Sequence, residues 1–140
     1  MDKRYTDRGK QGLVENMEAW TLDNDKYRVT VWTGKYFQMT VQAIQPGDDI
    51  DLEVHEESDQ FLRIEQGTGV CRMGDAEDKL TFEEKIEPES AILVPAGTWH
   101  QVVNTGDEVM KLYTIYAKPD HVEGTVHDTH EDAKNDPNEH

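Results

Sequence analysis

The stretch PGDDIDLEVH, residues 46–55, decides the fold of this chain together with its counterpart PAGTWHQVVN at residues 95–104. Each stretch opens on a proline and glycine turn, continues as a strand-like run and carries one histidine, His55 or His100. The sequence holds six histidines, and the last twenty residues contain the other four: His121, His127, His130 and His140. Before residue 121 the chain therefore has histidines only in these two stretches.

The central part of the chain predicts an all-β domain. Short segments rich in β-branched and aromatic residues alternate with Gly, Pro and Asp, and no 11-residue window between them sustains a helical period. This spacing is typical of an antiparallel sandwich or barrel. The expected strands are residues 27–33, 36–44, 51–55, 60–66, 69–73, 80–86, 91–94, 100–103 and 109–117.

Three parts follow from this pattern. Residues 1–26 form an N-terminal segment, in which residues 14–20 predict one short helix or strand, and residues 27–117 form the barrel. Residues 118–140 form an acidic, His-containing tail. We expect the tail to pack on the barrel up to about His127 and to be mobile from Asp132 to His140.

Composition limits the partners of the chain. At 140 residues the chain fits one domain, and 30 acidic against 14 basic residues give a formal net charge of −16. This charge repels nucleic acid and anionic membrane surfaces, so neither is an expected partner. No apolar stretch follows Met1, so we expect no secretory signal or membrane helix and a cytoplasmic protein. Cys71 is the only cysteine and is expected to be a small buried hydrophobe.

Strand alternation predicts a metal site. Glu53 and His55 lie two residues apart, so they point to the same side of their strand. A four-residue turn then brings the chain back to Gln60, and the turn beginning at Pro95 delivers His100. Two imidazoles, one carboxylate and one amide oxygen form a donor set for a divalent transition ion. The alternative is a metal-free interior in which Glu53 and His55 are an ordinary polar pair.

The two stretches resemble the paired motifs of the cupin superfamily. Gly47, His55 and Gly67 match the first motif, and the second is matched throughout by four residues: Pro95, Gly97, His100 and Asn104. The resemblance implies a cupin double-stranded β-helix, a jelly-roll barrel with a metal ion in its mouth. More narrowly, the chain is similar to small bacterial cupins labelled mannose-6-phosphate-isomerase-like. It departs from most cupins because Glu53 stands where they have His and Gln60 where they have Glu.

The resemblance implies a metal-binding protein with one divalent ion per chain (Zn, Mn, Fe or Ni), held by Glu53, His55, Gln60 and His100. We expect an isomerase or epimerase acting on a small sugar or a keto or hydroxy compound, with no residue yet assigned as catalytic and with a homodimer as the expected assembly. An Fe(II) dioxygenase and a non-catalytic small-molecule-binding cupin are the alternatives. A sugar phosphate is disfavoured because the barrel offers few cations: Lys35, Arg63, Arg72 and Lys111.

Parity arguments extend to the aromatic residues. Trp99 precedes His100 and is therefore expected to point away from the metal on a regular strand. Tyr113 and Tyr116 have opposite parity, so at most one of them can face the cavity. The histidines at 121, 127 and 130 invite a second metal site, but their spacing fixes no coordination geometry, and a solvated tail is the expected reading.

Overall fold

The computed structural model describes residues 3–139 and consists of two antiparallel sheets with little helix. The all-β expectation is confirmed, and each of the nine expected strands has a counterpart. The helices are α1 (Met17–Asp23) and α2 (His130–Asn135), with single 3-10 turns at Lys3–Tyr5 and Pro137–Glu139. The strands are β1 (Arg28–Thr33), β2 (Gln38–Ile44), β3 (Asp49–Glu53), β4 (Asp59–Gln66), β5 (Gly69–Gly74), β6 (Phe82–Ile86), β7 (Ala91–Val94), β8 (Trp99–Asn104), β9 (Met110–Ala117) and β10 (Val126–His127).

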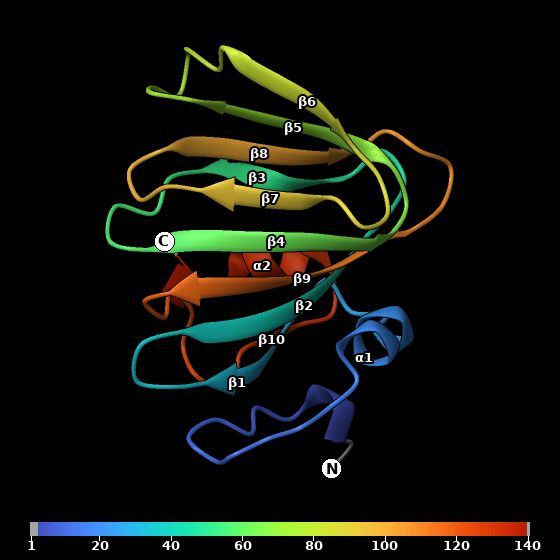
Figure 1. Cartoon of the computed structure of the whole chain (residues 1–140), viewed down its shortest axis with the longest axis vertical. Helices are drawn as coiled ribbons and strands as arrows, with labels where there is room; N and C mark the ends of the chain where they lie inside the picture. Colours follow the sequence, from blue (N-terminus) through green and yellow to red (C-terminus); the bar gives the residue numbers. More distant parts are fainter. Residues whose placement is uncertain (1–2, 140) are drawn as a thin grey trace.

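The strand order explains how the two motif stretches meet. One sheet has the order β10-β1-β2-β9-β4-β7 and the other the order β3-β8-β5-β6, and Figure 1 shows their stacked arrangement. The strand that ends the first motif, β3, pairs directly with the strand that carries the second, β8. β3 is also an edge strand, so the neighbouring residues of the first motif border a gap that another part of the chain can close.

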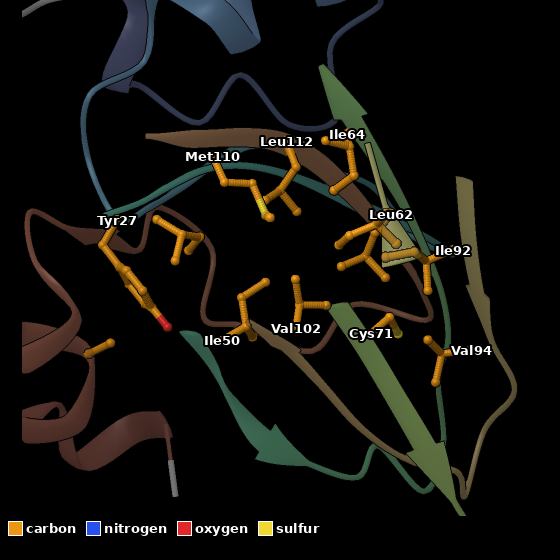
Figure 2. Close-up of a cluster of buried hydrophobic side chains, with 13 residues drawn as sticks. Tyr27, Ile50, Leu62, Ile64, Cys71, Ile92, Val94, Val102, Met110 and Leu112 are labelled. Carbon is orange, nitrogen blue, oxygen red and sulfur yellow. The ribbon is translucent and has the colours of Figure 1, made fainter. Parts of the chain in front are cut away.

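The main hydrophobic core lies between the sheets. In β4 the buried residues Leu62 and Ile64 alternate with more exposed neighbours, and Figure 2 shows them directed toward Val102 and Met110. Cys71 is 1% exposed within the same cluster, and this burial raises the pKa of its thiol to about 11. The expectation that Cys71 is a small buried hydrophobe is confirmed.

The first two strands reverse the usual pattern of apolar side chains inside and polar side chains outside. Val29, Val31 and Val41 pack beneath Trp20 of α1, in a second cluster on the outer face of the sheet. Their alternating neighbours therefore face the interior, where the hydroxyls of Thr40 and Thr114 lie 2.7 Å apart. This end of the interior is polar, as a ligand site requires.

The tail is folded onto the sheets over the described residues. β10 pairs with β1, with His127 opposite Arg28, so the predicted packing up to His127 is confirmed. The prediction of a mobile segment from Asp132 is wrong up to residue 139, while His140 lies outside the described residues. Thr129 and Asp132 form a capping box that starts α2, and Ala133 is 5% exposed against the core. None of the helices in residues 3–139 has the length and hydropathy needed to span a membrane.

Candidate metal centre and its cavity

Backbone hydrogen bonds between the two motifs fix their relative position. Asn104 Nδ2 donates to the carbonyl of Ile44 at 2.9 Å, and the amide of Gly47 donates to the carbonyl of Asn104 at 3.0 Å. At the other end of these strands, the amide of Gly97 donates to the carbonyl of His55 at 2.9 Å. Gly47 and Gly97 both have φ of +81°, a conformation that glycine adopts without strain. Gly47, Gly97 and Asn104 therefore fix the relative positions of the backbone segments that carry His55 and His100.

A bulge in β3 turns the acidic side chain inward. Ile50 pairs with Val102, but Glu53 pairs with His100, so β3 contains one residue more than its partner between these pairs. Without this extra residue Leu52 would take the place opposite His100. Because of the bulge, the side chains of Ile50 and Glu53 both point to the interior, although the two residues are three positions apart.

The structure brings Glu53, His55 and His100 together. The rings of His55 and His100 are 5.1 Å apart between centroids, and Nε2 of His55 lies 3.4 Å from Oε2 of Glu53. His100 is 1% exposed and the side chain of His55 is 8% exposed, whereas the side chain of Glu53 is 30% exposed, so the two imidazoles are shielded from bulk water and the carboxylate is partly open to it.

Both imidazoles are oriented by hydrogen bonds from Nδ1. His100 Nδ1 lies 3.1 Å from the carbonyl oxygen of Thr98, and because a carbonyl only accepts, this nitrogen carries the proton. His55 Nδ1 lies 3.1 Å from Oδ1 of Asp120, which accepts in the same way. Burial lowers the pKa of His100 to about 4, so its ring is neutral near pH 7. The Nε2 atom of His100 is therefore available as a ligand atom, as it is in His55 once a metal replaces any proton there.

Asp120 is a site residue that the sequence analysis missed. It lies three residues beyond the end of β9 and 65 residues from His55, so no local pattern connects the two. Burial opposes the charge on each partner, but their hydrogen bond and mutual attraction outweigh it: the pKa of His55 is raised and that of Asp120 is lowered. Burial raises the pKa of Glu53, and the charges of Arg28 and His55 partly offset this effect.

Gln60 lies inside the fold but is tied less directly to the other three predicted ligands. It is 4% exposed, and the β4–β9 register places it beside Tyr116, whose ring packs edge-on against His55 at 5.4 Å. Gln60 Oε1 is buried without a hydrogen-bond partner among residues 3–139, and the same is true of Nε2 of His55. A buried polar atom without a partner is costly, and a metal ion would satisfy both.

These residues fit a divalent transition ion. Two imidazole nitrogens and one carboxylate are suitable ligands for Zn, Mn, Fe or Ni, and the amide oxygen of Gln60 is a weaker fourth donor. Metal binding by Glu53, His55 and His100, with Gln60 or water as a further ligand, therefore stays a prediction.

A cavity of about 590 Å³ adjoins the site. Trp99 also lines it, and because Trp99 and the buried His100 alternate along β8, as expected of a regular strand, their side chains lie on opposite faces. The tail supplies part of the wall. The full lining is Arg28, Asp51, Leu52, Glu53, Val54, His55, Trp99, Asp120, Ala133 and Asn138.

Arg28 is the second residue that the sequence analysis missed. It is 3% exposed and lines the cavity, whereas the four expected cations lie elsewhere. Two of these pair with carboxylates outside the cavity, Arg63 with Glu65 and Arg72 with Glu83. The run Arg28-Val29-Thr30-Val31 in β1 alternates strictly between polar and apolar residues, but this pattern alone does not indicate which face is inside.

The aromatic and tail residues take separate places. Tyr116 is 1% exposed beside His55, while Tyr113 packs against Phe61, so the prediction that at most one of the two tyrosines faces the interior is confirmed.

The three tail histidines are buried, so the expectation of a solvated tail is wrong for them, but they contact different partners. His121 packs edge-on against Tyr116, and His127 Nε2 lies 2.9 Å from Asp136 Oδ2.

His130 holds the tail against the first motif. Its ring stacks on Tyr27 at 4.5 Å, Nδ1 lies 2.7 Å from Asp48 and Nε2 lies 2.8 Å from Asp51. Donor atoms of Asp48, Asp49 and His130 also lie within 4.8 Å of one another, as a metal site would require. Because both ring nitrogens already bind carboxylates, we interpret the group as an ionic latch.

The latch predicts a pH-dependent stability. Burial opposes protonation of His130, but the hydrogen bonds to Asp51 and Asp48 outweigh it and raise its pKa. A raised folded-state pKa means that the contribution is fully present below the unfolded value near pH 6.5 and is lost as the pH rises through the folded value. We expect His130→Gln to lower Tm by roughly 3 °C at about pH 6, and by progressively less as the pH rises through the raised folded-state pKa.

Thermal melts across this pH range test the prediction, with Asp49 and Tyr27 as the other ionisable groups facing the ring. The control is the same substitution in an Asp48→Asn, Asp51→Asn background, where the pH dependence of the difference should disappear. A pH-independent difference between His130→Gln and the unmodified chain would contradict the latch.

Comparisons with known proteins agree with this geometry. The cupin domain model matches residues 40–116. Protein YrkC of Bacillus subtilis (strain 168) is 50% identical over 127 residues, 91% of this chain and 68% of YrkC. Protein L612 of Acanthamoeba polyphaga mimivirus is 36% identical over 117 residues, 83% of this chain and 71% of L612.

A solved structure is also closely similar. The crystal structure of BH2720 from Bacillus halodurans has a TM-score of 0.91 and 49% sequence identity, covering 92% of this chain and 98% of that one. The jelly-roll topology, the paired motifs and these relatives agree, and the chain belongs to the cupin family.

Proposed function

We propose that this cupin is a metal-dependent isomerase or epimerase that moves a proton on a small sugar or a keto or hydroxy compound. The observation that carries the proposal is the convergence of Glu53, His55 and His100 beside a cavity of about 590 Å³, a size that suits a small molecule.

In this proposal the residues of the chain hold the metal ion and orient its ligands. When bound, a divalent ion would polarise a carbonyl and a neighbouring hydroxyl, which acidifies the hydrogen between them. Glu53, His55 and His100 would hold the ion, and Oδ1 of Asp120 keeps the proton of His55 on Nδ1. Trp99 and the tail form walls that limit the access of water to the cavity.

One observation favours a second candidate, an Fe(II) oxygenase. Two histidines and one carboxylate are the ligand set that leaves open positions for a substrate and O₂ on iron. The metal requirement separates the two functions, because proton transfer needs no redox change whereas oxygen chemistry does.

We expect the protein loaded with Zn²⁺ or Mn²⁺ to turn over a member of a panel of ketoses, aldoses and hydroxy acids under anaerobic conditions. Exchange of the substrate hydrogen with D₂O, followed by NMR, reports proton transfer directly. As a control, His100→Ala should show background exchange. Consumption of O₂ by the Fe²⁺ form, with no activity in the Zn²⁺ form, would replace the isomerase by the oxygenase. Binding without turnover by any form would leave a binding protein.

A further inference from the structure

We propose that the outer face of the six-stranded sheet is the interface of a homodimer, so that a second copy of this chain covers it. The homodimer expected above had no assigned interface. This inference goes beyond the proposed function, because it depends neither on a metal ion nor on a substrate. It rests on a row of apolar side chains, on the two hollows at the ends of the row and on the charges around them.

The row crosses five strands in register. Trp32 of β1 lies opposite Met39 of β2, and Met39 lies opposite Ile115 of β9. Phe61 of β4 is paired with Ile115 on one side and with Leu93 of β7 on the other. Figure 1 shows β7, β4, β9 and β2 side by side. The row points away from the main core, because side chains alternate along each strand and neighbours in sequence are buried: Gln38, Leu62, Val94 and Tyr116.

Much of this apolar surface is open to solvent. Leu93 is 68% exposed, and Phe37, whose ring packs against Trp32 at 5.0 Å, is 42% exposed. Val14, in the segment before α1, is 96% exposed. Exposed apolar side chains that stand singly are common, but a continuous row of them marks an interaction surface.

A hollow lies at each end of the row, and an exposed side chain stands beside each hollow. One hollow has a volume of about 390 Å³ and is bordered by Val14 and Trp32. The other has a volume of about 370 Å³ and is bordered by Phe61, Leu93 and Ile115. A two-fold axis parallel to the strands and passing near Ile115 exchanges the two ends. Leu93 of each copy then enters the hollow beside the partner's Trp32, and the partner's Val14 enters the hollow beside Phe61. Such a contact is self-complementary and closes at two copies.

The charges around the row permit an acidic chain to meet its own copy. The formal net charge is −16, but the five side chains of the row carry none of it. Among the described residues that line the two hollows, only Glu15 and Asp59 are charged. Glu15 pairs with Arg8 at 3.1 Å, and Asp59 accepts from a backbone amide at 2.9 Å. In the next row along the strands, Arg63 pairs with Glu65 at 2.8 Å. Like-charge contact is therefore small on this face.

The area of the face agrees with a dimer of moderate affinity. Five strands at a spacing of roughly 4.8 Å make the row about 20 Å long, and the hollows extend the apolar band at both ends. With the adjacent residues along the strands, each copy would contribute roughly 500 Å², or about 1,000 Å² for the pair, which is the lower limit for a specific interface. We therefore expect a dissociation constant in the micromolar range.

The test is sedimentation velocity of the full chain over a range of concentrations. The unmodified chain should pass from monomer to dimer as its concentration rises. Leu93→Asp and Val14→Asp should each weaken the dimer at least roughly tenfold, because a carboxylate would have to enter an apolar hollow without a partner. Both side chains are exposed, so circular dichroism of the two variants should match that of the unmodified chain.

Val122→Asp is the matched control. Val122 is 54% exposed and borders neither hollow, so this variant should dimerise like the unmodified chain. A chain that stays monomeric at its highest soluble concentration overturns the proposal and leaves the face to another occupant. A dimer that withstands both Leu93→Asp and Val14→Asp overturns it as well, because the interface then lies elsewhere. Trimers or longer assemblies contradict the two-fold pairing.

Cross-linking tests the exchange of ends. Leu93→Cys and Val14→Cys chains are mixed at low concentration, concentrated and oxidised, and a disulfide between the two kinds of chain is expected. The chain's own Cys71 is 1% exposed and does not compete. Val122→Cys in place of Val14→Cys should give no such product. Leu93→Cys chains that cross-link only to one another would overturn the proposed arrangement.

Discussion

Replacing both His55 and His100 by alanine is expected to reduce the metal content of the purified protein from about one ion per chain to background. The remaining donors, Glu53 and Gln60, are one carboxylate and one neutral amide, which compete poorly with water for a transition ion. The measurement is elemental analysis of protein purified without a histidine tag, followed by competition with a chelator of known affinity.

The design separates loss of ligands from loss of structure. A double variant of His127 and His130 removes the same number of imidazoles outside the site and should keep its metal, although both residues are buried and its Tm should fall. Asp120→Asn keeps the ligands but changes the partner of His55 Nδ1, and we expect about 10–100-fold weaker binding. An unchanged metal content in the variant of His55 and His100 would refute the site.

Strand alternation predicted part of this site. Glu53 and His55 do share a face, because residues two apart on a strand point the same way. The face that they share could not be predicted, since it depends on the bulge between Ile50 and Glu53, and β3 alone gives no sign of the extra residue.

Contacts between residues that are distant in sequence could not be predicted from strand alternation. Asp120 reaches His55 across 65 positions and Arg28 pairs with His127 across 99, and neither contact leaves a periodic signal. The cupin motifs predicted the fold because Gly47 and Gly97 form backbone turns and Asn104 joins the two motif stretches by hydrogen bonds. The tail was misjudged because its acidic composition suggested solvation, whereas a capping box, the buried Ala133 and the contacts of His130 fold and dock a short helix.

Truncation of the tail is expected to have the second large effect, in two distinguishable steps. Ending the chain after Thr129 removes α2, and with it the His130 latch and the Ala133 contact with the core. We expect Tm to fall by roughly 3–10 °C, because about one to three kcal/mol of packing and charge-assisted hydrogen bonding is lost. Metal affinity should hardly change, since Asp120 remains. Ending the chain after Pro119 also removes β10 and leaves β1 as an unpaired edge.

For this shorter chain we expect a fall in Tm of more than roughly 10 °C and metal binding weakened as in Asp120→Asn. Thermal melts and metal competition on both truncations, with the single variant beside them, measure the two steps separately. Matching metal affinities in the shorter chain and the full chain would show that Asp120 does not orient His55. A chain ending at Thr129 that has the same Tm as the full chain would show that α2 does not stabilise the fold. The tail would then close the cavity without stabilising the fold, and its contacts with the first motif would matter only when a ligand is bound.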